Sequence, residues 1–307
     1  MNENPIFVKR KLGEKMDVSF AFIREHLKMM VRLILPVSLP FAILMALLLT
    51  AENIYNDTWR SSHLTLHNAV DVDKVSTPIM YVAIIMAVVL IVPMTFTVMK
   101  LACPFHQSGD SKNKDLRFKK IWVEYLRSIM EFVAITIPYA VFLIAWNLMF
   151  KHQDSFMLFL IQYAVIILAV VAWMMAPPAY IVGDTGYGRS IAKGISYGFH
   201  HFMNILPFIL VMSVLCILIF LWELGLISFI TDFKVQLVGG DVDKHFLAYC
   251  IYWIILFFLF LLLASSITLA LTVATIGITY EFGSLEDRHR FFSIRQRIEN
   301  FEKLRDS

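Results

Sequence analysis

The sequence predicts an all-α integral membrane protein with six membrane-spanning helices and amphipathic helices on the cytoplasmic side. Its 307 residues are 59% hydrophobic and 17% charged, and the mean hydropathy is +0.69. Soluble domains are less apolar and more highly charged. The apolar residues form runs that lack the alternation of barrel strands. The runs are long enough to cross the roughly 30 Å hydrocarbon core, which takes about 20 helical residues.

Six apolar runs predict the spans of a membrane domain over residues 1–281, followed by an amphipathic cytoplasmic tail over 282–307. The spans are expected at about 33–50, 79–103, 132–150, 156–180, 205–230 and 246–280. The last run is about 35 residues, on the order of 50 Å at 1.5 Å per residue. It therefore has to tilt, kink or protrude from the bilayer.

The distribution of Lys and Arg predicts the orientation. Seven precede or adjoin the first span, seven lie in or beside the second connection, two lie in the fourth connection and six in the tail. The connections on the opposite side hold only five of the 27. The positive-inside rule places the basic side in the cytoplasm. We therefore expect a multi-pass protein of a bacterial cytoplasmic (inner) membrane, with both termini in the cytoplasm.

Amphipathic stripes precede the first, third and fifth spans and indicate a repeated unit of surface helix, span, outer loop and span. The stripes are Leu12, Met16, Phe20, Ile23 and Leu27; Phe118, Trp122, Tyr125, Ile129 and Phe132; and Ile191, Ile195, Phe199, Phe202 and Leu206. A fourth, Phe291, Ile294, Ile298 and Phe301, lies in the tail. Such helices either bury an apolar face in the headgroup boundary or pack on the ends of neighbouring spans, and the pattern leaves both open.

The third stripe lies in the stretch GDTGYGRSIAKGISYGFHHF (183–202), which has the composition of a binding site. Its glycine spacing fits neither a P-loop nor GxGxxG. We expect Gly183 to end the fourth span and Asp184 or Thr185 to cap the next helix. The consecutive His200 and His201 point about 100° apart on a helix with 3.6 residues per turn, so no metal or cofactor is expected.

The same turn is also a candidate for contact with a lipid phosphate, since helix N-termini bind anions. The residues that would make this contact are Asp184, Gly186, Gly188, Arg189 and Lys193.

Polar residues within the spans are further candidates, because they are costly in the membrane. Arg32 and Glu131 lie near the inner boundary and could form an ion pair, or Arg32 could snorkel. Glu223, in LWELG, is either a pathway carboxylate or an interfacial residue beside Trp222. Hydroxyl residues on the last span follow helical spacing, which indicates either a packing face or a polar path. They are Ser265, Thr268, Thr272, Thr275 and Thr279.

The stretch PPAYIVGDTGYGRSIAKGISYGFHHFMNILPF combines a span, an acidic-glycine turn, a small-residue amphipathic helix and the next span. It resembles the bacterial membrane-domain family typified by the membrane part of glycerophosphodiester phosphodiesterases. The tail ITYEFGSLEDRHRFFSIRQRIENFEK resembles the ending of stand-alone relatives of the Bacteroidetes type. The matching positions are Asp184, Ser190, Gly194, Tyr280, Phe282, Ser284, Leu285, Glu286, Arg297, Ile298 and Glu299.

This resemblance implies a six-helix fold and a class whose activity is mostly unassigned. No βα alternation or acidic metal cluster follows Tyr280, so the hydrolase activity of the fused relatives is not expected. The sequence also lacks a nucleophile elbow and a zinc motif. We expect a non-enzymatic scaffold or lipid-interacting module. The alternative is a small-molecule or lipid transporter that uses the hydroxyl face and Glu223.

The expected partners are membrane lipids and other membrane proteins. Nucleic acid is not expected, because the basic clusters are explained by topology.

Overall fold

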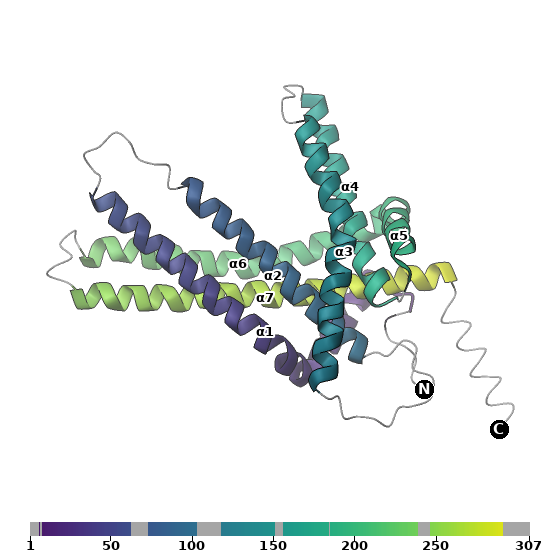
Figure 1. Cartoon of the computed structure of the whole chain (residues 1–307), viewed down its shortest axis with the longest axis horizontal. Coiled ribbons are helices and arrows are strands. Elements are labelled where there is room, and N and C mark those ends of the chain that lie inside the picture. The colour runs from purple at the N-terminus through teal and green to yellow at the C-terminus, as the bar shows by residue number, and fades with distance from the viewer. Residues whose placement is uncertain are drawn as a thin grey trace. The chain divides into compact units, whose positions relative to one another are not determined.

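A computed structural model describes residues 6, 8–62, 73–102, 118–150, 156–183, 185–238 and 246–290. Over these residues the secondary structure is helical and contains no strand. The helices are α1 (Leu12–Ser62), α2 (Asp73–Ala102), α3 (Phe118–Phe150), α4 (Phe156–Ile181), α5 (Tyr187–His200), α6 (Phe202–Val238) and α7 (Phe246–Arg290) (Figure 1). The prediction of an all-helical chain is confirmed for this part of the sequence.

The chain divides into two compact units. Unit 1 consists of Met1–Leu33, Val92–Val211 and Thr272–Ser307, and unit 2 consists of Ile34–Ile91 and Met212–Leu271. The divisions fall inside α1, α2, α6 and α7, so each of these helices contributes one segment to each unit.

Five of the described helices are long and apolar enough to cross a membrane: α1, α2, α3, α4 and α7. A sixth is added if α5 and the start of α6, which meet at a 91° bend, are counted as one broken span. The predicted spans lie on these helices, and the run expected over 205–230 lies on α6. The chain therefore has the helices of a polytopic integral membrane protein.

The sequence predicts a surface helix before the first span and another before the third, but in the structure neither is separated from its span. α1 begins at Leu12 and α3 at Phe118, and each continues into its span as one helix. Their sequences contain no glycine after Gly13 that would favour an interruption. Of the three predicted surface helices, α5 alone is separated from the helix that follows it.

The apolar stripe predicted at the start of α1 faces outward within unit 1. Phe20 and Leu27 are about half exposed, whereas Lys15 and Ser19 on the same helix are buried. Asp17, Arg24, Glu25 and Lys28 are exposed as well. The outward side of this segment therefore carries both apolar and charged residues, as is usual for a helix segment at the membrane interface.

Unit 2 is held together by carbon packing between helix segments. Its core clusters combine alanines with larger apolar side chains, which lets the helices approach closely. One cluster is Phe41, Ala42, Met45, Ala83, Ala87, Ile91 and Ala264. The other is Ala46, Trp253, Leu256 and Phe260.

The bend between α5 and α6 is made at His201. Its φ of −114° and ψ of 17° depart from helical values, while its N–H still bonds the Tyr197 carbonyl. The His201 carbonyl in turn accepts hydrogen bonds from the N–H groups of Asn204 and Ile205, at 2.9 and 3.0 Å. One residue therefore ends α5 and starts α6, which turns the chain sharply without leaving these backbone groups unpaired.

Candidate functional site

The helix α5 packs on α4 through its smallest residues. Gly194 and Gly198 are buried, and a Cβ atom on Gly194 would lie 2.7 Å from the Ala172 carbonyl oxygen. One on Gly198 would lie 2.8 Å from the Ala172 Cα. Both positions therefore require glycine for close approach of the two backbones. The G-x-x-x-G spacing in GISYG is the sequence signal for this contact.

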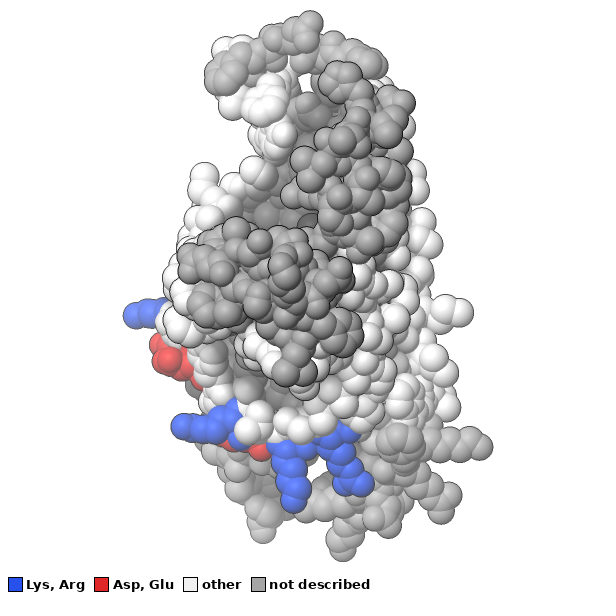
Figure 2. Space-filling model, turned by 90° about the vertical axis from the view of Figure 1, so that its left-hand side faces the viewer, with Lys and Arg blue, Asp and Glu red and all other residues white. Residues whose placement is uncertain are grey.

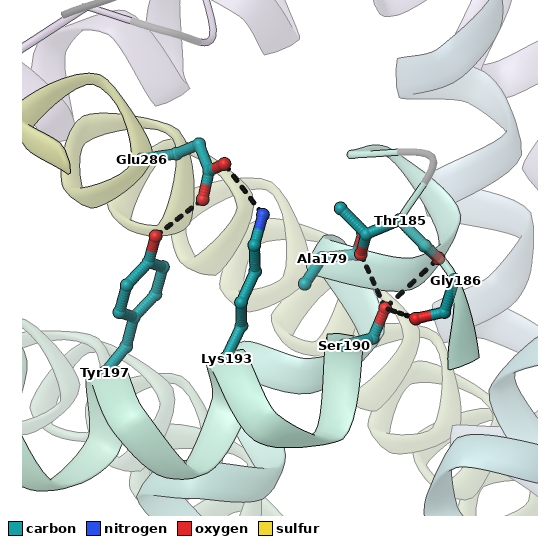
Figure 3. A network of polar contacts seen from close by, with 7 residues as sticks. All are labelled: Ala179, Thr185, Gly186, Ser190, Lys193, Tyr197 and Glu286. Atoms are coloured by element: carbon teal, nitrogen blue, oxygen red, sulfur yellow. Dashed lines mark hydrogen bonds and ion pairs between the residues drawn. The ribbon is translucent and has the colours of Figure 1, made fainter. Parts of the chain in front are cut away.

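The turn before α5 ends α4 as predicted. The Gly183 N–H bonds the Pro178 carbonyl at 2.9 Å, which satisfies one of the last carbonyls of α4. The Thr185 hydroxyl donates to the Ala179 carbonyl at 2.6 Å and lies 2.6 Å from the Ser190 hydroxyl. The turn is therefore joined by side-chain hydrogen bonds to both the helix it leaves and the helix it enters (Figure 3).

The predicted cap of α5 is wrong. Gly186, with φ −61° and ψ 152°, is the N-cap residue, and it makes no side-chain capping bond. Thr185 precedes the N-cap residue, and its hydroxyl donates to the Ala179 carbonyl of α4. Asp184 lies outside the described residues.

One flank of α5 is tied to the end of α7 within unit 1. The Lys193 ammonium lies 2.7 Å from Glu286 Oε1, and the Tyr197 hydroxyl donates to Glu286 Oε2 at 2.6 Å (Figure 3). The Glu286 side chain is only 3% exposed. Both of its oxygens have charged or hydroxyl donors, as a buried carboxylate requires.

A second buried pair joins the start of α1 to α7. Lys15 Nζ lies 2.5 Å from Glu281 Oε2, and the two side chains are 5% and 0% exposed. Glu281 Oε1 is buried and has no hydrogen-bond partner among the residues that the structure describes. We call the five residues Lys15, Lys193, Tyr197, Glu281 and Glu286 the charge network.

The segment before α1 adds backbone contacts to the same end of α7. The Lys9 N–H donates to Asp287 Oδ2 at 3.1 Å, and the Arg10 N–H donates to Ser284 Oγ at 3.2 Å. The Arg10 guanidinium lies 5.6 Å from the centroid of the Tyr280 ring. Burial lowers the pKa of Arg10, although Tyr280, Glu14 and Asp287 oppose that shift. Arginine nevertheless stays protonated in proteins.

The charge network joins elements that are far apart in sequence but contains no arrangement of a nucleophile with a base. Its contacts hold α1 and α5 to α7, so its evident role is to fix these helices together.

Over the described residues, no group of three or more His, Cys, Asp and Glu could hold a metal ion. His200 Nδ1 lies 3.1 Å from the Ser196 carbonyl oxygen of its own helix.

The predicted lipid-contact residues are only partly together. Gly186, Gly188 and Arg189 are exposed at the start of α5, whereas Lys193 is paired with Glu286. A Cβ atom on Gly186 or Gly188 would meet nothing within 4 Å. Arg189 is therefore the predicted contact residue whose charge faces outward and has no ion pair within the described part of the chain.

The ion pair expected between Arg32 and Glu131 is not the one observed. Glu131 Oε1 lies 2.8 Å from Arg127 Nε, one turn earlier on α3, and Arg32 is exposed. The i, i+4 spacing on one helix brings Arg127 to Glu131 without any tertiary contact.

The hydroxyl residues of the last helix differ in exposure. Thr268, Thr272 and Thr275 are buried, whereas Ser265 is exposed. The hydroxyls of Ser265 and Thr268 donate to carbonyls four residues earlier, at 2.8 and 3.0 Å, and Thr279 does the same at 2.8 Å. Such bonds within the helix are usual for Ser and Thr. The side chain of Glu223, on α6, lies outside the described residues.

The charge network was not predicted from the sequence, although a signal for it was present. Glu281, Glu286 and Asp287 follow an apolar run without a break, and the helix that carries them continues to Arg290. Acids at the end of a span require partners if they are buried. Lys15 lies on the side of its helix opposite the apolar stripe, so the helical pattern alone does not indicate that it is buried.

No protein-family model, curated protein or solved structure matches the chain.

Proposed function

We propose that the protein is a non-enzymatic, lipid-interacting membrane module in which α5 lies in the headgroup region of the bilayer. The observation that carries this proposal is the 91° bend between α5 and the start of α6. A helix that leaves a span at a right angle and keeps an apolar flank exposed has the properties of an interfacial helix. The resemblance to the membrane part of glycerophosphodiester phosphodiesterases and the cytoplasmic placement of both termini stay predictions.

The three flanks of α5 support a surface position. Its small residues face α4, and Ile195 and Phe199, which are 44% and 58% exposed, extend outward. Arg189 is exposed on the remaining flank. An apolar flank can enter the acyl boundary while a basic side chain meets an anionic headgroup. Arg189 rather than Lys193 would make that contact, since Lys193 is paired with Glu286.

The charge network supports the scaffold part of the proposal. It ties α5 to α7 through Glu286 and ties α1 to the same helix through Glu281. α5 is therefore held at the membrane surface by contacts with two other helices, α4 and α7. A helix fixed in this way can present the same face to lipid, or to another membrane protein, at all times.

Spin labelling tests the surface position. Cys103, Cys216 and Cys250 would be replaced by serine, and single cysteines would be introduced along α5 for labelling in phosphatidylethanolamine–phosphatidylglycerol vesicles. We expect labels at Ile195 and Phe199 to be relaxed mainly by oxygen, and labels at Arg189 and Ser196 mainly by a water-soluble nickel chelate. Uniform relaxation by the nickel chelate along all of α5 would overturn the proposal.

The charge of Arg189 offers a second test. Arg189→Gln should lower the enrichment of phosphatidylglycerol around the protein about fivefold, because one basic residue near an anionic surface contributes about 1 kcal/mol. Arg127→Gln is the matched control, since Arg127 is also exposed but is paired with Glu131. Equal enrichment in both variants and the wild type would remove Arg189 from the contact.

The transporter alternative also stays a prediction. The hydroxyls of Ser265 and Thr268 bond to their own helix, and no observation among the described residues favours a path along them.

A further inference from the structure

A pocket of about 420 Å³ lies between α3, α4 and α5, wholly within unit 1. Its wall includes Tyr139 and Phe142 of α3, Leu168 and Ala172 of α4, and Ile195 and Phe199 of α5. The lining is almost entirely carbon. Its volume is in the range of small-molecule sites, about 300–1,000 Å³.

The pocket is formed by two contacts that position α5. On one side, Gly194 and Gly198 bring the α5 backbone against Ala172 of α4. On the other, Pro138 has no N–H to bond the Ala134 carbonyl, and the Tyr187 hydroxyl donates to that carbonyl at 3.2 Å. The first turn of α5 is thereby joined to α3 and its later turns to α4.

The hydrogen-bonding groups at the pocket are already used. The Tyr139 hydroxyl donates to the Ile191 carbonyl oxygen at 3.4 Å. An occupant would therefore be recognised by shape and apolar contact, with no polar group required.

We infer that this pocket holds one acyl chain of a membrane phospholipid. The pocket is lined by two helices that are long and apolar enough to span the bilayer, α3 and α4. Their outward residues, such as Ile137, Val141, Leu160 and Ile167, are exposed. The wall of the pocket is therefore continuous with a surface that bilayer hydrocarbon covers. The inference rests on the proposed function, because it assumes that α5 lies in the headgroup region.

A chain inside the pocket differs from the lipid on the outer surface of the helices. It contacts protein on three sides, and dispersion contacts accumulate with the number of neighbouring atoms. Such a chain should exchange slowly and stay with the protein when surface lipid is removed by detergent.

The test compares two substitutions of equal kind on α4. Val165→Trp places an indole in the pocket, since Val165 is in its lining, whereas Ile167→Trp places one on the exposed surface of the same helix. Full-length protein would be reconstituted in vesicles of palmitoyl-oleoyl phosphatidylethanolamine and phosphatidylglycerol at 3:1. It would then be extracted into detergent, and the retained lipid counted by native mass spectrometry.

We expect one phospholipid to be retained by the wild type and by Ile167→Trp, and at least a tenfold lower occupancy in Val165→Trp. Leu168→Trp, which fills the pocket from another position, replaces Val165→Trp if the helical circular dichroism of that variant is lost. Equal retention in the pocket-filling variant and Ile167→Trp would overturn the inference. A further set of vesicles would contain added palmitic acid. Retention of free palmitic acid in place of phospholipid from these vesicles would also overturn the inference.

The spin-label profile of α5 separates this inference from the proposed function. A profile with oxygen-accessible Ile195 and Phe199, together with no pocket-dependent retention, leaves α5 at the surface and overturns the acyl-chain site alone. A profile that is water-accessible throughout overturns both.

Discussion

Units 1 and 2 differ in the contacts that join the helices inside each of them. In unit 1, buried ion pairs join Lys15 to Glu281 and Lys193 to Glu286. Figure 2 shows the Lys, Arg, Asp and Glu side chains that the structure describes on one face of the molecule. The core of unit 2 is formed by alanines and large apolar side chains. Unit 1 therefore combines buried ion pairs with apolar packing, such as the cluster of Ile135, Tyr139, Ala172 and Ala176, whereas the core clusters of unit 2 are apolar.

The polar residues of the two units also bond differently. In unit 2, the side chains of Thr50 and Asn53 donate to carbonyls four residues earlier on α1, at 2.7 and 2.8 Å. In unit 1, Lys15, Lys193 and Tyr197 donate to carboxylates on another helix. Unit 1 also contains local bonds, such as that from the Thr279 hydroxyl to the Thr275 carbonyl. What distinguishes it is the set of bonds from these three side chains to carboxylates of another helix.

The largest effect is expected from the buried pair of unit 1. Lys15→Met leaves Glu281 buried without its cation, which should lower the free energy of unfolding in detergent by about 3–5 kcal/mol. The double variant Lys15→Met, Glu281→Leu removes both charges and should recover most of that loss, because apolar replacements of buried pairs are often tolerated. A Lys15→Met variant as stable as the wild type would contradict this account.

Loss of one donor to Glu286 should have a smaller effect. Tyr197→Phe removes a hydroxyl that bonds a carboxylate, and hydrogen bonds to charged groups contribute about 1.5–3 kcal/mol. Thermal unfolding should show the loss in the wild-type background but little further loss when Lys193→Met, Glu286→Leu is already present. If Tyr197→Phe lowered the stability as much in the Lys193→Met, Glu286→Leu background as in the wild type, the Tyr197 hydroxyl would act independently of Glu286.

The close approach of α5 to α4 can be tested at its glycines. Gly198→Leu forces side-chain atoms against the α4 backbone at Ala172 and should cost about 1–3 kcal/mol, as overpacking usually does. Gly188→Ala is the control on the same helix, because its Cβ would meet nothing within 4 Å. That variant should be neutral or slightly stabilising, since alanine favours helix over glycine. Equal destabilisation of the two would argue against the packing described for α5.

The smallest effect is expected in unit 2. Thr268→Val removes a hydroxyl that donates to the Ala264 carbonyl of its own helix at 3.0 Å. The change should stay below about 1 kcal/mol, since such bonds in membrane helices contribute about 0.6 kcal/mol on average. A loss as large as that of Tyr197→Phe would erase the distinction between the units. The measurement is the same detergent unfolding experiment.

The fold class and the helical content could be predicted because long apolar runs depend only on local composition. The approximate location of the spans followed from the same signal. The continuity of α1 and α3 was missed because an amphipathic segment and an apolar span differ in composition without any residue that ends a helix between them. The end of α4 at Gly183 was predictable, because a glycine there matches a common way for helices to finish.

The candidate site was harder to predict, because its contacts join residues far apart in sequence. Lys15 and Glu281 are 266 positions apart, and Lys193 and Glu286 are 93 apart. A helical pattern indicates which residues share a face, but it does not identify the element that the face contacts. For the same reason the position of Glu131 near the inner boundary suggests Arg32 as a possible partner, although its observed partner, Arg127, lies one turn away on the same helix.

The bond between Tyr187 and Ala134 has a consequence for the biosynthesis of the chain. The carbonyl freed by Pro138 is made 53 residues before the hydroxyl that bonds it. Before Tyr187 is made, that carbonyl has to be satisfied by interfacial water, because backbone groups of a membrane helix need a hydrogen-bond partner. The Tyr187 hydroxyl then takes the place of that water. Ribosome-bound chains that stop before Tyr187 should therefore show more water at Ala134 than chains that extend past it.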